Sequence, residues 1–168
     1  MSEAKIQLLN KVQTKQKIKR IAYEIYENNF DEKEIVFVGV ERMGYIFAKH
    51  LIAEYQLISK QKTELIKLLL DKYSPLQSEI KLVGDYPIKN KVVILVDDVL
   101  NTGRTLVYSL KPFINIEIKK LQTAVIIDRN YKLFPVSADY VGYALSTTLK
   151  EHIKVVLDDE KEFGVYLD

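Results

Sequence analysis

Short apolar runs rich in β-branched residues alternate with longer stretches of helical periodicity along this chain of 168 residues. The predicted strands are Glu34–Val40, Thr63–Leu70, Glu79–Val83, Lys91–Val96, Gln122–Ile127, and shorter runs at Tyr140–Val141, His152–Leu157 and Phe163–Leu167. The predicted helices cover the first thirty residues, with room for a break near Gln13–Gln16, then Gly44–Leu57 and Gly103–Ile114. This alternation predicts an α/β fold in which helices cover both faces of a central, mostly parallel sheet.

Loops with turn chemistry separate several of these elements. Lys72–Ser78 (KYSPLQS) and Gly84–Asn90 (GDYPIKN) each contain a proline that resists regular structure. Ligands of open α/β sheets bind beyond the carboxyl ends of the strands. The loops that follow Val40, Val96 and Ile127 are therefore the expected places for a binding site.

One of those strand ends carries a concentrated group of polar residues. The segment Val93–Thr105 reads VILVDDVLNTGRT, so the carboxylates of Asp97 and Asp98 come where the apolar strand is expected to end. Residues 102–105 (TGRT) follow at the expected start of a helix, where backbone N–H groups, hydroxyls and a glycine suit a phosphate. Two carboxylates would repel that phosphate, but they suit the hydroxyls of a sugar or a metal ion.

This arrangement of apolar residues, two acidic residues and T-G-x-[ST] resembles the signature for 5-phosphoribosyl-1-pyrophosphate (PRPP) in type I phosphoribosyltransferases. The resemblance implies that fold, with a small hood and a flexible loop. It implies that Asp97 and Asp98 hold the ribose hydroxyls as catalytic residues, and that Asn101, Thr102, Gly103, Arg104 and Thr105 bind the 5′-phosphate. Mg²⁺ is the expected cofactor, carried by PRPP and touching Asp97 and Asp98 at most. A plain strand with an acidic end is the alternative, as is a response-regulator receiver, which lacks the T-G-x-T segment.

A second resemblance covers nearly the whole chain. It is carried by Gln16–Asn29, Val38–Ala48, Val92–Leu106 and Ile126–Gly142, which follow one another in the expected order. These stretches resemble the pyrimidine-operon attenuation regulators, which are also uracil phosphoribosyltransferases. The resemblance implies transfer of the phosphoribosyl group of PRPP to a nucleobase, with uracil the first candidate, and release of pyrophosphate.

The same resemblance assigns the remaining site residues. It places pyrophosphate on the loop formed by Val40, Glu41, Arg42, Met43 and Gly44, together with Lys72 of the flexible loop. It places the base against Asp128 and Arg129 and against the backbone of Val141 and Gly142. Taken without the resemblance, Asp128–Arg129 reads as a weak surface ion pair, and Arg42 alternatively as a solvated surface charge.

Several positions depart from the family pattern. Met43 stands where a basic residue is common, and Leu70–Pro75 lacks the arginine of the flexible loop, which leaves Lys72 as a point charge instead of a planar fork. Tyr143–Lys150 is less polar and less basic than in relatives, so the identity of the base stays open. A catalytically degenerate relative that binds PRPP or a nucleotide is therefore one alternative.

A nucleotide-sensing, RNA-binding regulator is the other alternative. Tyr23 and Tyr131 stand where the attenuation regulators have histidines, although basic residues such as Lys19, Arg20 and Lys132 are present. Charge and aromatic stacking would suit single-stranded RNA, but the same residues suit a solvated helix face. RNA binding is therefore considered without being favoured.

Composition limits the other classes of function. The chain has no cysteine and two histidines, which excludes disulfides and thiolate metal sites and argues against a histidine cage. A net charge of +2 gives no overall attraction to nucleic acid or to an anionic membrane. The absence of a signal-peptide core and of a membrane-spanning apolar run predicts a cytoplasmic protein. We expect one domain over residues 1–168, with an amino-terminal helical segment (1–30) and a carboxy-terminal hood segment (139–168), assembled as a homodimer or larger oligomer.

Overall fold

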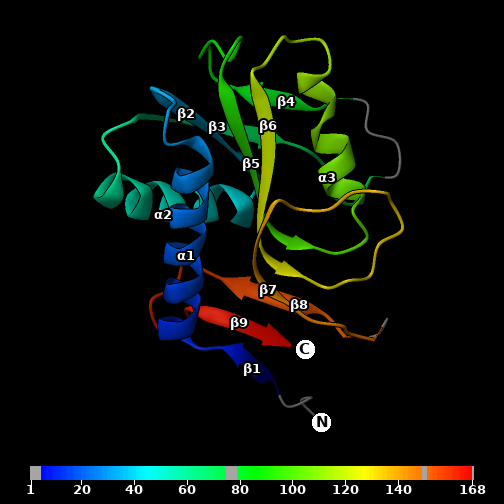
Figure 1. Ribbon diagram of the computed structural model, residues 1–168. Coiled ribbons are helices and arrows are strands. Elements are labelled where there is room, and N and C mark those ends of the chain that lie inside the picture. Colours follow the sequence, from blue (N-terminus) through cyan, green and yellow to red (C-terminus); the bar gives the residue numbers. More distant parts are fainter. Residues whose placement is uncertain (1–4, 75–78, 149–150, 168) are drawn as a thin grey trace.

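A computed structural model describes residues 5–74, 79–148 and 151–167, and its centre is a six-stranded sheet (Figure 1). The strand order is β4-β3-β2-β5-β6-β7, and all neighbours are parallel except β3 and β4. The strands are β2 (Glu34–Val40), β3 (Lys62–Leu69), β4 (Lys81–Val83), β5 (Val92–Leu100), β6 (Lys120–Asp128) and β7 (Tyr140–Ala144). The predicted α/β architecture with a mostly parallel sheet is confirmed.

A second, antiparallel sheet forms the hood. It contains β1 (Ile6–Leu9), β8 (Ile153–Val156) and β9 (Gly164–Leu167) in the order β1-β9-β8. The two ends of the described chain therefore lie side by side in this sheet (Figure 1). The prediction that the first thirty residues are helical is wrong for Ile6–Leu9, which pair with β9 instead of continuing the helix.

A capping box formed by Asn10 and Gln13 caps the N-terminus of the first helix, α1 (Lys11–Asn29). Asn10 Oδ1 accepts from the Gln13 backbone at 2.9 Å, and Gln13 Oε1 accepts from the Asn10 backbone at 2.9 Å. This reciprocal pair satisfies two of the free N–H groups of the first turn. The helix runs without interruption through Gln13–Gln16, so the predicted break is wrong.

Two further helices flank the sheet. The second helix, α2 (Met43–Ile58), matches its prediction closely, whereas α3 (Arg104–Ser109) is much shorter than the predicted Gly103–Ile114. A 3-10 turn at Lys111–Phe113 replaces the rest, because Pro112 has no N–H to donate and its ring clashes with the preceding turn.

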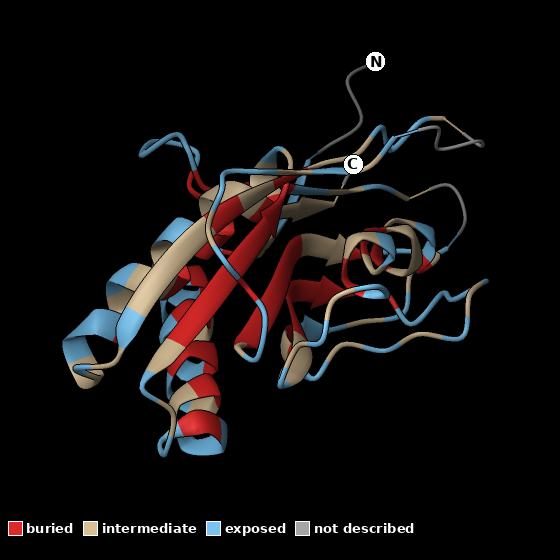
Figure 2. Ribbon diagram, turned by 90° about the horizontal axis from the view of Figure 1, so that it is seen from above, coloured by how far each residue is buried: buried red, intermediate tan, exposed pale blue. Residues whose placement is uncertain are grey.

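The core lies on both faces of the sheet (Figure 2). Alternate residues of β2 point to opposite faces, so that Phe37 packs with α1 and α2, whereas Val38 packs on the side of α3. In β5, Ile94 and Leu95 divide in the same way. Both faces of these strands are buried, which explains why their sequences are almost continuously apolar.

Strand β5 continues four residues past the predicted end at Val96. Its parallel pairing with β6 extends through Asp97 opposite Val125 and Leu100 opposite Asp128. The acidic pair is therefore built into the last part of a buried strand, and the connection to α3 is short.

Candidate functional site

The two adjacent carboxylates of β5 differ in burial. The side chain of Asp97 is 4% exposed, whereas that of Asp98 is 18% exposed. Asp97 Oδ1 accepts a hydrogen bond from the Asp98 backbone at 2.9 Å. The first turn of α2 approaches closely, because a Cβ atom on Gly44 would lie 2.7 Å from the Val96 carbonyl and 3.1 Å from Asp97 Oδ1.

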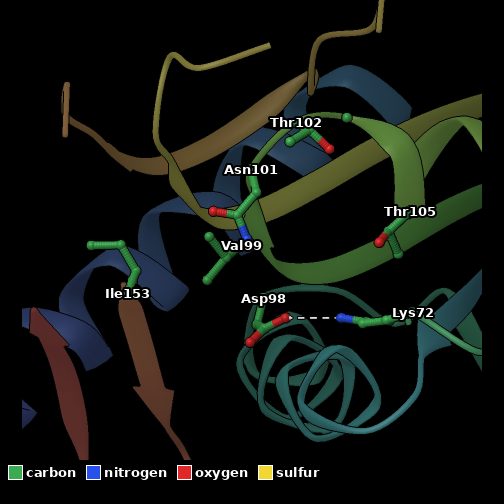
Figure 3. Close-up of a pocket in the computed structure, with 8 residues that line it drawn as sticks. Lys72, Asp98, Val99, Asn101, Thr102, Thr105 and Ile153 are labelled. Carbon is green, nitrogen blue, oxygen red and sulfur yellow. Dashed lines mark hydrogen bonds and ion pairs between the residues drawn. The ribbon is translucent and has the colours of Figure 1, made fainter. Parts of the chain in front are cut away.

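Lys72, from the loop after β3, reaches this acidic pair. Its Nζ atom lies 2.9 Å from Asp97 Oδ1. The same atom lies 3.5 Å from Asp98 Oδ1 (Figure 3). Burial raises the pKa of Asp97 to about 7, even though the charge of Lys72 opposes that shift. Burial alone would lower the pKa of Lys72, but the two carboxylates raise it above its ordinary value, so the ammonium stays charged.

A cavity of about 140 Å³ opens beside this cluster. Lys72 and Thr105 lie at one end, Ile153 of the hood at the other, and Val99 and Asn101 between them (Figure 3). The wall is completed by Asp98, Thr102 and Gly103. The cavity thus has an end with hydroxyls and charge and an end with aliphatic side chains.

The loop between β5 and α3 is held by backbone contacts. The Thr102 carbonyl accepts from the backbones of Leu133 and Phe134 at 2.8 and 3.0 Å. Gly103 has φ +88°, and a Cβ atom there would lie 2.6 Å from Val136, so both conformation and packing require glycine. Arg104 lies outside the cavity wall, with its guanidinium 5.6 Å from the centre of the Phe134 ring.

Arg129 follows β6 and is buried, with 8% of its surface exposed. Its Nη1 atom donates to Asn101 Oδ1 at 2.8 Å, and Nε donates to Thr147 Oγ1 at 2.7 Å. Its Nη2 atom donates to the carbonyls of Thr148 and Glu151 at 3.0 and 2.9 Å. The interpretation of Asp128–Arg129 as a surface ion pair is wrong, because both residues are buried and Asp128 pairs with Lys132 at 3.3 Å.

The loop after β2 points its charged side chains away from the cavity. Arg42 Nη2 lies 2.9 Å from Asp158 Oδ2, and Glu41 Oε1 lies 3.0 Å from Lys67 Nζ. Val40 is buried in the sheet, and Met43 begins α2. Gly44 packs directly against Asp97 of the acidic pair.

The backbone of β7 faces α1 at the two positions expected to meet a base. The carbonyls of Val141 and Gly142 accept from Arg20 Nη2 at 3.0 and 2.6 Å. Neither residue lines the cavity beside Asp98. The structure therefore places these residues in an α1–β7 contact.

Comparison with known proteins identifies the family. The family model of the phosphoribosyl transferase domain matches residues 6–160 of this chain. The chain belongs to the phosphoribosyltransferase family. Its relatives include the "Bifunctional protein PyrR" of Clostridium botulinum, 34% identical over 94% of this chain and 92% of that protein. The protein of the same name from Clostridium kluyveri is 37% identical over 83% of each chain.

Solved structures show that the fold is that of type I phosphoribosyltransferases. A hypoxanthine-guanine phosphoribosyltransferase from Bacillus anthracis has a TM-score of 0.76 at 24% identity, with 98% of each chain covered. A hypoxanthine phosphoribosyltransferase from Trypanosoma cruzi has a TM-score of 0.80 at 18% identity, covering 99% of this chain and 92% of the other. The small hood expected of this fold is the β1-β9-β8 sheet.

Three residues of this candidate site were missed by sequence reasoning. Val99 lies within the signature, where its apolar side chain marks it only as a strand residue. Ile153 reaches the cavity from the hood, and Thr147 anchors Arg129. Neither of these two has a local sequence signal, because each contact depends on segments brought together only by folding.

Within the described ranges, no group of three or more acidic or histidine side chains is arranged to hold a metal ion. Carboxylate oxygens are ligands that Mg²⁺ prefers, and Asp98 presents them to the cavity with the buried Asp97 beside it, which suits an ion whose other ligands come from a substrate. In the same part of the chain, no helix has the length and apolar character needed to cross a membrane.

Proposed function

We propose that this phosphoribosyltransferase transfers the phosphoribosyl group of PRPP to a nucleobase, with uracil the first candidate, and releases pyrophosphate. The observation that carries the proposal is the arrangement of Asp98, Thr102 and Thr105 around one cavity. Carboxylates that suit sugar hydroxyls lie next to hydroxyls and backbone N–H groups that suit a phosphate. Uracil is chosen because of the resemblance to the pyrimidine-operon regulators.

The ribose and its 5′-phosphate occupy the polar part of this cavity. Asp97 and Asp98 accept hydrogen bonds from the ribose hydroxyls, and residues 101–105 surround the phosphate. Helix α3 has only six residues, so its dipole is short, and loop amides and threonine hydroxyls supply the main interactions. Arg104 has to leave Phe134 to contribute its charge.

Pyrophosphate lies toward residues 40–44 and Lys72. The cavity of about 140 Å³ is smaller than the several hundred Å³ typical of ligand pockets, and Lys72 occupies the acidic pair. Lys72 therefore exchanges its carboxylate partners for pyrophosphate oxygens when PRPP binds. Arg42 is available in the same way if it releases Asp158.

The chemistry is displacement of pyrophosphate from the anomeric carbon by a ring nitrogen of the base. Positive charge grows on the ribose as the bond to pyrophosphate lengthens, and Asp97 and Asp98 lie beside it. Positioning and electrostatic stabilisation are therefore the main contributions of the protein. When bound, Mg²⁺ neutralises the charge of the leaving pyrophosphate.

The base occupies the aliphatic end of the cavity, between Val99 and Ile153. Neither Asp128 nor Arg129 lines the cavity. Arg129 reaches it through its contact with Asn101, and Asp128 pairs with Lys132. The backbone of Val141 and Gly142 reaches the base only if Arg20 releases their carbonyls.

The test is a pyrophosphate-release assay with Mg²⁺, PRPP and a panel of nucleobases. We expect release with one base, uracil first, and much slower release from Asp98→Ala. Release with a different base corrects the substrate and keeps the reaction. Binding of PRPP without release from any base supports the catalytically degenerate alternative.

RNA binding is a second candidate function, because this chain resembles the pyrimidine-operon attenuation regulators and its relatives are named bifunctional. Tyr23 and Tyr143 are exposed beside the basic face of α1, where Lys17 lies 5.8 Å from the centre of the Tyr143 ring. Arg20 counts against it, because its guanidinium is engaged by Val141, Gly142 and Glu24. A mobility-shift assay with single-stranded RNA, with and without nucleotide, tests this function. The absence of a shift would reject RNA binding and leave phosphoribosyl transfer as the proposed function.

A further inference from the structure

The guanidinium of Arg129 is a buried cation whose hydrogen-bond partners among the described residues are all neutral. Its four hydrogen bonds go to one amide oxygen, one hydroxyl and two backbone carbonyls. No carboxylate within the described ranges lies at ion-pair distance from it, although Asp128 is the preceding residue. Such a group costs free energy to bury unless its donors are well used.

The bond to Asn101 fixes the orientation of that amide. Arginine carries only donors, so the atom of Asn101 that faces Nη1 at 2.8 Å must be the carbonyl oxygen. The amide nitrogen then points the other way, on the side of Val99 (Figure 3). Asn101 thus presents N–H donors to the cavity, and its acceptor is held by Arg129.

Asn101 also lies at a particular place along the cavity. Thr105 and Lys72 mark the end assigned to phosphate and pyrophosphate, and Ile153 marks the aliphatic end (Figure 3). Asn101 and Val99 lie between these ends, beyond Asp98. The donor therefore faces the junction of ribose and base and is displaced from the phosphate.

We propose that Arg129 is a positioning residue that acts on the nucleobase through Asn101, whose amide N–H it directs at an acceptor atom of the base. The inference rests on the proposed function and deepens it. Asn101 becomes a base-contacting residue instead of a phosphate ligand, and Arg129 has no direct contact with the base. Arg129 also ties the β5–α3 loop to Thr147 and Thr148, which precede β8.

The test is a double-mutant cycle measured by calorimetric binding, with Asn101→Ala, Arg129→Lys and the double variant. Lysine keeps the charge but cannot hold Asn101, Thr147 and two carbonyls at once. The probes are a panel of nucleoside monophosphates that starts with UMP, together with ribose 5-phosphate, which lacks the base. Lys119→Met, at an exposed residue paired with Glu32, is the control.

We expect each single variant to weaken the nucleotide that binds wild type best by about tenfold, and the double variant to weaken it no further. Affinity for ribose 5-phosphate should change by less than about twofold, since the donor faces the base. Losses that multiply in the double variant would show that Arg129 contacts the base itself and overturn the inference. Unchanged nucleotide binding in both single variants, or equal loss of ribose 5-phosphate, would also overturn it.

Two outcomes separate the inference from the proposed function. If wild type binds none of the nucleotides, the proposed function fails, and the inference fails with it. If Arg129→Lys does not fold, the same comparison is made with Asn101→Ala and Asn101→Asp. Aspartate keeps an acceptor for Arg129 and removes the donor, so nucleotide affinity falls in both variants. Nucleotide affinity kept by Asn101→Asp would show that Asn101 serves only to satisfy Arg129.

Discussion

The carboxylate of Asp97 is shielded from water, and its Oδ1 atom accepts from both Lys72 and the backbone of Asp98. Burial at the end of a strand disfavours its charge, and the nearby Lys72 only partly compensates. The sequence identified the acidic pair because the two residues interrupt an apolar run. Sequence reasoning assigned Lys72 to pyrophosphate and did not pair it with these carboxylates, because Lys72 lies 25 positions from Asp97 in sequence.

The raised pKa of Asp97 predicts a pH dependence of stability. In the folded protein the pKa of Asp97 is about 7, whereas in the unfolded chain it is near the usual 3.8. Between these two pH values the folded protein keeps a proton that the unfolded chain has released. The contribution of Asp97 to the free energy of unfolding is therefore fully present below about pH 4 and is lost as the pH rises through about 7. It amounts to a few kcal/mol at most, since one pKa unit corresponds to about 1.4 kcal/mol.

Urea unfolding at pH 5 and pH 8 measures this effect. Asp97→Asn should lose less stability than wild type between the two pH values, because it carries no titrating carboxyl group. The exposed Asp85→Asn should follow wild type. Equal loss in all three proteins would contradict the assignment of Asp97 as the titrating group.

Asp98 is the more accessible carboxylate and is predicted to matter for turnover more than for folding. Asp98→Ala removes a charged acceptor for ribose, worth about 1.5–3 kcal/mol, so turnover should fall about 10- to 100-fold. Unfolding free energy should change by less than about 1 kcal/mol, because the contact with Lys72 is long and partly exposed. Steady-state kinetics and urea unfolding check both values, and unchanged turnover would rule out this role.

The elements place the site by close approach of α2 to β5. The predicted boundaries of α2 were accurate because its apolar spacing is regular. The predicted ends of β5 and α3 were wrong. Strand β5 continues because pairing with β6 outweighs the low strand preference of aspartate, a tertiary effect that local sequence does not report. The end of α3 was readable from Pro112, and the helical periodicity beyond it was misleading.

Gly44→Ala is predicted to disturb the site through the backbone. The added methyl group would lie 2.7 Å from the Val96 carbonyl and 2.9 Å from Asp97 Cα, so α2 and β5 must separate. We expect a loss of about 1–3 kcal/mol in stability, together with weaker PRPP binding.

The control for this variant is Gly84→Ala, at a residue with φ +125° and no atom within 4 Å of the added Cβ. It should lose stability through backbone strain and keep its PRPP affinity. Calorimetric titration of PRPP distinguishes the two variants. Equal PRPP affinity in both would contradict the idea that the close packing of α2 against β5 at Gly44 shapes the site.

At the scale of the whole molecule, the hood joins both ends of the described chain over the site. Strand β1 pairs with β9, and β8 carries Ile153 to the cavity. Sequence reasoning found the final hairpin and the apolar strands of the central sheet, because each is a local pattern. It missed β1, whose partner lies at the other end of the chain, and for the same reason it missed Ile153 and Thr147.

Leu9→Ala is predicted to loosen the hood. Leu9 is 5% exposed and packs with Val165 in the core, so truncation should cost about 2–4 kcal/mol of unfolding free energy. Nucleotide affinity should fall more than ribose 5-phosphate affinity, because Ile153 of the hood lines the end of the cavity proposed for the base. Leu57→Ala, at a residue 78% exposed, should change neither quantity. Urea unfolding and calorimetry provide the measurements. An unchanged unfolding free energy in Leu9→Ala would contradict the prediction that packing of Leu9 stabilises the hood.

Calorimetric titration of PRPP with Mg²⁺ is the decisive experiment for the proposal that Asp97, Asp98 and residues 101–105 form a PRPP site. We expect wild type to bind one PRPP per chain, and an Asp97→Asn, Asp98→Asn double variant, folded at the same temperature, to bind it at least about tenfold more weakly. Absence of PRPP binding by wild type, or equal binding by the double variant, would contradict it.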